Sequence, residues 1–152
     1  MRVGLAADHE GYELKVQLLD SLRQLNFQVT DFGAVNLNPD DDYPDFIVPL
    51  AQAVGKKEID RGIAICGSGI GACIASNKVK NVRAGIIQDD FSARQGVEDD
   101  DMNIICIGSR LVEFKLALEL VKIFLATDFS GKPRHIRRIA EISHLELAER
   151  TQ

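Results

Sequence analysis

Two kinds of hydrophobic pattern alternate along this chain. Short apolar runs predict β-strands at 2–7, 27–33, 61–66, 83–87 and 103–108. Apolar residues at helical spacing predict helices at 12–25, 44–57, 71–79, 91–98, 111–126 and about 134–150. Continuous apolar runs such as "RGIAIC" are typical of parallel strands that are buried on both faces. The pattern therefore predicts an α/β fold, a three-layer α/β/α sandwich with a five-stranded parallel sheet.

Turn residues and prolines refine this outline. The stretch "AVNLNPDDDYP" is acidic and rich in turn residues, so it predicts an exposed loop before the helix that starts at Pro44. Pro49 fits that helix only if it lies in the first turn. No repeat, low-complexity segment or linker interrupts the alternation, and 152 residues suffice for one core. We expect a single domain over 1–152.

Composition narrows the classes of partner. The net charge of -5 argues against nucleic acid or an anionic membrane as partner, because no general basic field attracts phosphate backbones. No apolar run reaches the roughly 18 residues of a transmembrane helix, and the N-terminus lacks the pattern of a signal peptide. The three cysteines have no C-x-x-C spacing, which favours reduced thiols, a cytoplasmic protein and no metal site.

Polar residues follow the predicted strands at the points where they end. They are Asp8 and His9, the loop from Cys66 to Gly71, Asp89 and Asp90, and Ser109 with Arg110. Each alone could be a helix cap or a turn. Because open parallel sheets bind ligands at the carboxyl ends of their strands, these residues together predict a binding site at one edge.

The loop "CGSGIG" at 66–71 is the most informative of these segments. Its glycines let backbone N–H groups approach a small anion, and the following helix adds the positive end of its dipole. The loop lacks the Walker lysine and the third glycine of a dinucleotide fingerprint, so a nucleotide is disfavoured. Cys66 could be a base or nucleophile with a lowered pKa, or equally a small buried hydrophobe.

Several motifs together resemble one known family, the type B ribose-5-phosphate isomerases, which include the galactose-6-phosphate isomerase subunits. The matching segments are "AADHEGYELK" at 6–15, "DYP" at 42–44, "ICGSGIGACIASNKV" at 65–79, "RAGI" at 83–86, "FSAR" at 91–94, "GSR" at 108–110, and the arginines 134 and 138. The resemblance implies a Rossmann-like fold and isomerisation of a phosphorylated monosaccharide through an enediolate, without a cofactor. It also implies a homodimer, or a dimer of dimers, with active sites shared between subunits.

The resemblance also implies roles for individual residues. Cys66 would be the base, with N–H groups from Gly67, Ser68, Gly69, Ile70 and Gly71 on the enediolate. Ser68 would relay protons, Asp8 would hold sugar hydroxyls and Tyr43 would border the sugar. The phosphate would be bound by His9, Arg110, Arg134 and Arg138, and Asn103 matches a further binding position. These roles meet the needs of proton transfer, which are a base, oxyanion donors and a shuttle.

One position departs from the family pattern. The family carries H-N-x-x-N before the last strand, and its histidine helps to open the furanose ring; here that position is Asp99. Either the carboxylate accepts the hydroxyl proton instead, or the substrate has no furanose ring, as in a tetrose 4-phosphate. Ribose 5-phosphate is the favoured interpretation. The alternatives are another sugar phosphate, tetrose 4-phosphate or hexose 6-phosphate, or a sugar-phosphate-binding subunit without catalysis.

Overall fold

The computed structural model describes residues 1–148, and its strands and helices alternate as predicted. The strands are β1 (Arg2–Ala7), β2 (Gln28–Asp31), β3 (Arg61–Cys66), β4 (Ala84–Ile86) and β5 (Ile104–Gly108). The helices are α1 (Tyr12–Gln24), α2 (Pro44–Gly55), α3 (Ile70–Asn77), α4 (Asp90–Asp100), α5 (Phe114–Ala126) and α6 (Pro133–Ala148). The α/β fold class is confirmed, although β2 and β4 are shorter than the predicted strands.

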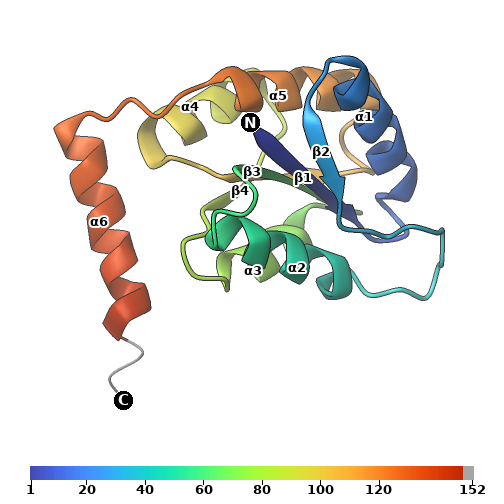
Figure 1. The fold of residues 1–152 in the computed structure, drawn as a ribbon, viewed down its shortest axis with the longest axis horizontal. Helices are drawn as coiled ribbons and strands as arrows, with labels where there is room; N and C mark the ends of the chain where they lie inside the picture. The colour runs from blue at the N-terminus through green and yellow to red at the C-terminus, as the bar shows by residue number, and fades with distance from the viewer. Residues whose placement is uncertain (149–152) are drawn as a thin grey trace.

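The strands form one parallel sheet in the order β2-β1-β3-β5-β4. Helices α1, α4 and α5 cover one face of this sheet, and α2 and α3 cover the other (Figure 1). The central strand β3 shows why its sequence is apolar from Gly62 onward. Ile63 and Ile65 pack among the side chains of α1 and α5, whereas Ala64 and Cys66 face α2 and α3. Burial on both faces leaves no position from Gly62 to Cys66 for a charged side chain.

Helix α2 corrects the expectation for Pro49. The helix begins at Pro44 and runs without a break to Gly55, so Pro49 lies beyond the first turn. A proline there removes a single backbone hydrogen bond from the helix. Ile47 and Leu50 on the other side of α2 are fully buried, and this packing holds the helix together despite the lost bond.

A buried lysine ties α1 to the end of β2. The Lys15 side chain is 1% exposed, and its Nζ lies 2.7 and 2.8 Å from the carboxylate oxygens of Asp31. The same Nζ donates to the Ala34 carbonyl at 2.6 Å. A buried ammonium is tolerated only when it is paired and hydrogen-bonded, and these three contacts supply that.

Helix α6 stands away from the sheet and its layers (Figure 1). Several of its apolar side chains are exposed, namely Ile136, Ile142, Leu145 and Leu147. The predicted helix extended to about residue 150, and its last two positions lie outside the described residues. Within residues 1–148, none of the helices combines the length and apolarity needed to cross a membrane.

Candidate active site

The carboxyl ends of three adjacent strands bring the first group of predicted residues together. Ala7 at the end of β1 pairs with Ile65 of β3, and Cys66 pairs with Gly108 at the end of β5. Asp8, the loop from Cys66 to Gly71, and Arg110 therefore leave the sheet at neighbouring points. Because β2 and β3 lie on opposite sides of β1, this edge is also where the strand order reverses, the usual place of a ligand crevice.

The glycine loop has the backbone geometry that the sequence predicts for it. Gly69 adopts φ +81, and a Cβ built there would lie 3.1 Å from the Gly108 backbone nitrogen. Only glycine satisfies both conditions. The Gly69 N–H donates to the Cys66 sulfur at 3.2 Å, and the Ile70 N–H donates to the Ser68 hydroxyl at 3.2 Å. Cys66 is 5% exposed, so its thiol lies just beneath the loop.

Two side chains form the walls of this loop. A Cβ built on Gly71 would lie 2.8 Å from the Tyr43 ring, so the ring packs directly on that glycine. A Cβ built on Gly67 would lie 3.4 Å from Arg110 Nε, and the backbone N–H of Arg110 donates to the Gly67 carbonyl at 3.1 Å. An aromatic wall on one side and a guanidinium on the other suit a sugar that carries an anionic group.

Asp8 lies at the end of β1 and is 6% exposed. One of its carboxylate oxygens accepts from the N–H groups of Glu10 and Gly11 at 3.0 and 3.1 Å. Burial raises the pKa of Asp8, and these two backbone hydrogen bonds only partly offset it. The carboxyl group is thus fixed in place by its backbone contacts.

His9 is held by a carboxylate that the sequence did not single out. Asp41 Oδ1 accepts from the His9 backbone N–H at 2.9 Å and lies 2.7 Å from its ring Nδ1. This contact is the main reason why the pKa of His9 is raised, and the charges of Asp8, Asp41 and Glu10 act in the same direction. Asp41 lies in the acidic segment predicted to be an exposed loop, yet its side chain is 7% exposed. His9 and Asp41 are 32 positions apart, so no local sequence pattern could have predicted their contact.

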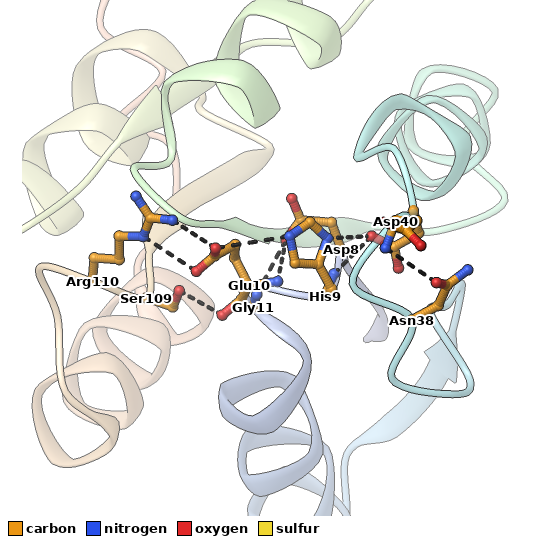
Figure 2. Close-up of polar contacts among 9 residues, drawn as sticks. Asp8, His9, Glu10, Gly11, Asn38, Asp40, Ser109 and Arg110 are labelled. Carbon is orange, nitrogen blue, oxygen red and sulfur yellow. Dashed lines mark hydrogen bonds and ion pairs between the residues drawn. The ribbon is translucent and has the colours of Figure 1, made fainter.

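Arg110 is paired in the same network (Figure 2). Its guanidinium meets both carboxylate oxygens of Glu10, with Nη2–Oε1 at 2.6 Å and Nε–Oε2 at 3.2 Å. Glu10 Oε1 also lies 3.8 Å from His9 Nε2. The pairing lowers the pKa of Glu10 and raises that of Arg110. Both cations that this edge offers to a phosphate therefore already face a carboxylate.

Asp89 and Ser109 are engaged in local structure. Asp89 caps α4, accepting from the Ser92 N–H at 2.8 Å and from its hydroxyl at 2.9 Å. The Ser109 hydroxyl donates to the Glu10 carbonyl at 2.7 Å and so joins the ends of β5 and β1 (Figure 2). These contacts match the alternative of caps and turns.

A second group of predicted residues lies at the opposite edge of the sheet. Asp99 is in the last turn of α4, and Asn103 precedes the first residue of β5. The Asn103 amide accepts from the Arg83 N–H at 2.7 Å and donates to the Asn81 carbonyl at 2.8 Å. Because α4 runs back from the carboxyl edge to the amino edge, these residues do not meet Cys66 within one chain.

The two remaining arginines belong to this second group. Arg134 and Arg138 are exposed near the start of α6, which lies beside the end of α4. Among residues 1–148, neither forms an ion pair or hydrogen bond. Four positions apart on a helix, they share one side and are available to an anion.

A cavity of about 590 Å³ lies between α6 and the body of the protein. Its walls include Arg83, Ser92, Asp100, Ile142 and Leu145, and none of the predicted site residues lines it. The glycine loop and this cavity are thus separate features.

Comparison with known proteins places the chain in a family. A sequence profile described as Ribose/Galactose Isomerase matches residues 3–142. Ribose-5-phosphate isomerase B of Mycobacterium leprae is 38% identical over 146 residues, which cover 96% of this chain and 90% of that protein.

Two solved structures have nearly the same fold. Ribose-5-phosphate isomerase B of Clostridium thermocellum is similar with a TM-score of 0.94 and 41% identity, covering 98% of this chain and 99% of that one. Ribose-5-phosphate isomerase B of Mycoplasma genitalium, solved with bound ribulose-5-phosphate, gives a TM-score of 0.91 and 38% identity, covering 95% of each chain. Because the profile matches most of the chain and these relatives are 38–41% identical to it over nearly its whole length, the chain belongs to the Ribose/Galactose Isomerase family.

Proposed function

We propose that this protein is an aldose–ketose isomerase that interconverts ribose 5-phosphate and ribulose 5-phosphate. The observation that carries the proposal is the Cys66 thiol, 3.2 Å from the Gly69 N–H, in a loop of glycines at the start of α3. A base and an oxyanion cradle are thereby adjacent. The Mycoplasma genitalium relative, with bound ribulose-5-phosphate, supports this choice of substrate.

The reaction moves protons and electron pairs within the substrate. The Cys66 thiolate takes the proton from C2 of the open-chain aldose, and the electron pair of that bond forms the enediolate. The proton returns to C1, while the O2 proton passes to O1 through a hydroxyl such as Ser68. Backbone N–H groups of Gly69 and its neighbours hold the developing oxyanion, and Asp8 holds a sugar hydroxyl. No external oxidant or reductant is consumed.

The phosphate of the substrate requires cations. His9 and Arg110 lie beside the glycine loop, whereas Arg134 and Arg138 lie at the other edge of the sheet. We infer that the two arginines reach the phosphate from a second copy of the chain. Each site then combines the carboxyl edge of one subunit with the α6 region of its partner.

A homodimer, or a dimer of dimers, follows from this arrangement. Support comes from α6, which stands off the body (Figure 1) and exposes Ile142 and Leu145 at 52% and 68%. An exposed apolar surface of this kind is typical of an interface between chains. The free cysteines are typical of a cytoplasmic enzyme, which is the location we propose.

Asp99 is the reason to consider a second class of substrate. A carboxylate replaces the imidazole expected there, and a tetrose 4-phosphate needs no ring opening because its O4 carries the phosphate. A panel of four-, five- and six-carbon sugar phosphates, followed by exchange of the C2 proton in D₂O, separates the candidates. Brisk tetrose exchange with negligible pentose exchange would replace ribose 5-phosphate as the substrate. No exchange with any sugar would favour a non-catalytic subunit.

The role of Cys66 is tested by substitution. Cys66→Ala should reduce ribose 5-phosphate turnover by about 10²–10⁴-fold, because removing a general base typically costs that much. Binding of the substrate, measured calorimetrically, should change little. Cys73→Ala is the matched control, because Cys73 lies in α3 beyond the glycine loop and should retain turnover. If Cys66→Ala keeps more than roughly a tenth of the wild-type rate, Cys66 is not the base.

A further inference from the structure

The His135 side chain is buried and has two polar contacts, although it lies near the exposed start of α6. The chain has three histidines, and this one is 4% exposed although it lies in the first turn of α6 between two exposed residues. Its ring Nδ1 lies 2.8 Å from the Ser130 hydroxyl and 3.5 Å from Asp99 Oδ1. Asp99, which stands where the family pattern has a histidine, thus has an imidazole beside it. Asp99 belongs to α4, whereas the imidazole comes from α6.

The contact is built by the backbone as well as by side chains. The Ser130 N–H donates to the Glu98 carbonyl at 3.0 Å, which ties the loop before α6 to the last turn of α4. Its hydroxyl then meets the His135 ring and accepts from the Lys132 N–H at 3.4 Å. Asp99 and His135 are therefore brought together by two anchored elements.

Both oxygen partners face the same ring nitrogen, Nδ1, and both can accept a hydrogen bond. We therefore assign the ring proton to Nδ1. Nε2 is then left with its lone pair, and an imidazole oriented in this way is a typical general base and, once protonated, a general acid. Arg134 is its neighbour in sequence and Arg138 lies on the same part of α6. A phosphate bound by these arginines would lie on the part of α6 that carries the imidazole.

We propose that His135 is the acid–base catalyst that opens the furanose ring of ribose 5-phosphate, with Asp99 as its positioning residue. This rests on the proposed isomerase function and on the shared site. Nε2 takes the proton from the anomeric hydroxyl, and the O1–H electron pair becomes the carbonyl bond. The C1–O4 bond breaks with its pair on O4, which receives the proton back from the imidazolium. The products are the open-chain aldehyde and an unchanged imidazole.

Two substrates isolate this step. Ribose 5-phosphate must be opened before its C2 proton can leave. Ribulose 5-phosphate cannot close to a furanose, because its O5 carries the phosphate, so exchange of its C1 proton in D₂O requires only the later chemistry. His135→Asn keeps an N–H donor near the position of Nδ1 and removes Nε2. His144→Asn is the matched control, the same substitution at an exposed position of the same helix.

In His135→Asn, turnover of ribose 5-phosphate should fall by about 10²-fold, while C1 exchange from ribulose 5-phosphate should stay within about 3-fold of wild type. Asp99→Asn should also lower turnover of ribose 5-phosphate more than C1 exchange from ribulose 5-phosphate, but by a smaller factor than His135→Asn. With excess His135→Asn enzyme, the rate on ribose 5-phosphate should stop rising with enzyme concentration, because spontaneous ring opening then supplies the aldehyde. Thermal unfolding of each variant verifies that it is folded.

Equal losses in the two reactions would assign His135 a structural role, and unchanged rates would remove it from the mechanism; either result overturns the inference. A wild-type protein that processes neither pentose phosphate would instead reject the proposed function, and the inference with it. The two failures are distinguished by the wild-type exchange reaction.

Discussion

Asp41 is the residue that sets the charge of His9. Its carboxylate raises the pKa of the imidazole, and an imidazolium attracts a phosphate by its charge, which a neutral ring lacks. The KM for a sugar phosphate should therefore rise as pH increases through this raised pKa. Asp41→Asn returns the pKa toward its ordinary value of 6.5, so the same rise in KM should occur at a lower pH.

The measurement is KM against pH for the wild type and for two variants. Asp40→Asn is the control, since Asp40 is exposed and its backbone N–H contacts Asn38 rather than His9. An Asp41→Asn profile that coincides with that of the wild type would show that His9 does not control phosphate binding.

Single residues mark the boundary of what the sequence could predict. The roles proposed for Cys66 and Gly69 depend on local chemistry, a thiol and a backbone with positive φ, and local chemistry can be recognised in a motif. Asp41 and His135 depend on partners from distant segments, so only the folded chain reveals them. Lys15 belongs with them, because a lysine within an amphipathic helix pattern gives no sign of being 1% exposed.

At the scale of elements, the glycine loop yields a stability prediction. Gly69→Ala places a Cβ at φ +81 and 3.1 Å from the Gly108 nitrogen, whereas Gly131→Ala meets φ +62 with nothing within 4 Å. Both should lose about 1–2 kcal/mol of unfolding free energy from backbone strain alone. Gly69→Ala should lose more than Gly131→Ala, and its turnover should fall because the N–H cradle shifts.

Urea unfolding of both variants, with turnover measured alongside, tests this comparison. Equal stability losses would mean that the loop adjusts to the added methyl group, which would contradict a rigid loop of N–H donors.

The ion pair between α1 and β2 yields a second prediction at this scale. Lys15→Met should lower the free energy of unfolding by about 3 kcal/mol, the low end for breaking a buried pair, because Asp31 is partly exposed and can be hydrated. Lys122→Met on the exposed side of α5 is the control and should stay within about 0.5 kcal/mol. A Lys15→Met protein as stable as the control would show that the pair contributes nothing to the fold.

The elements themselves were largely predictable. Buried parallel strands leave continuous apolar runs, and the five runs mark the five strands. The edge strands β2 and β4 are shorter than predicted, because only one neighbour pairs with each and their ends leave the ladder. The course of α2 through Pro49 was not predictable, since its stability comes from packing against residues that are distant in sequence.

At the scale of the whole molecule, the separation of the two residue groups predicts complementation. Cys66→Ala and Arg134→Ala should each be impaired alone, yet a mixed dimer should contain one intact site. After random exchange of equal amounts, activity should recover to about a quarter of wild type, because half of the dimers are mixed and each has one working site of two.

Unequal tags on the two variants and native mass spectrometry verify the exchange. Exchange without recovery would place Cys66 and Arg134 in the same chain's site and would contradict the shared arrangement.

The paired cations of the site have a consequence for the rate of substrate capture. His9 faces Asp41 and Arg110 faces Glu10, so beyond a Debye length of roughly 10 Å each pair looks nearly neutral. The charge that attracts an approaching sugar phosphate then comes chiefly from Arg134 and Arg138, which have no carboxylate partner among residues 1–148 and reach the site from a second copy in the proposed dimer. Added salt should therefore slow association. Once at the loop, a phosphate dianion can displace a carboxylate from its cation, but an unphosphorylated sugar cannot, so the carboxylates act as a filter for charge.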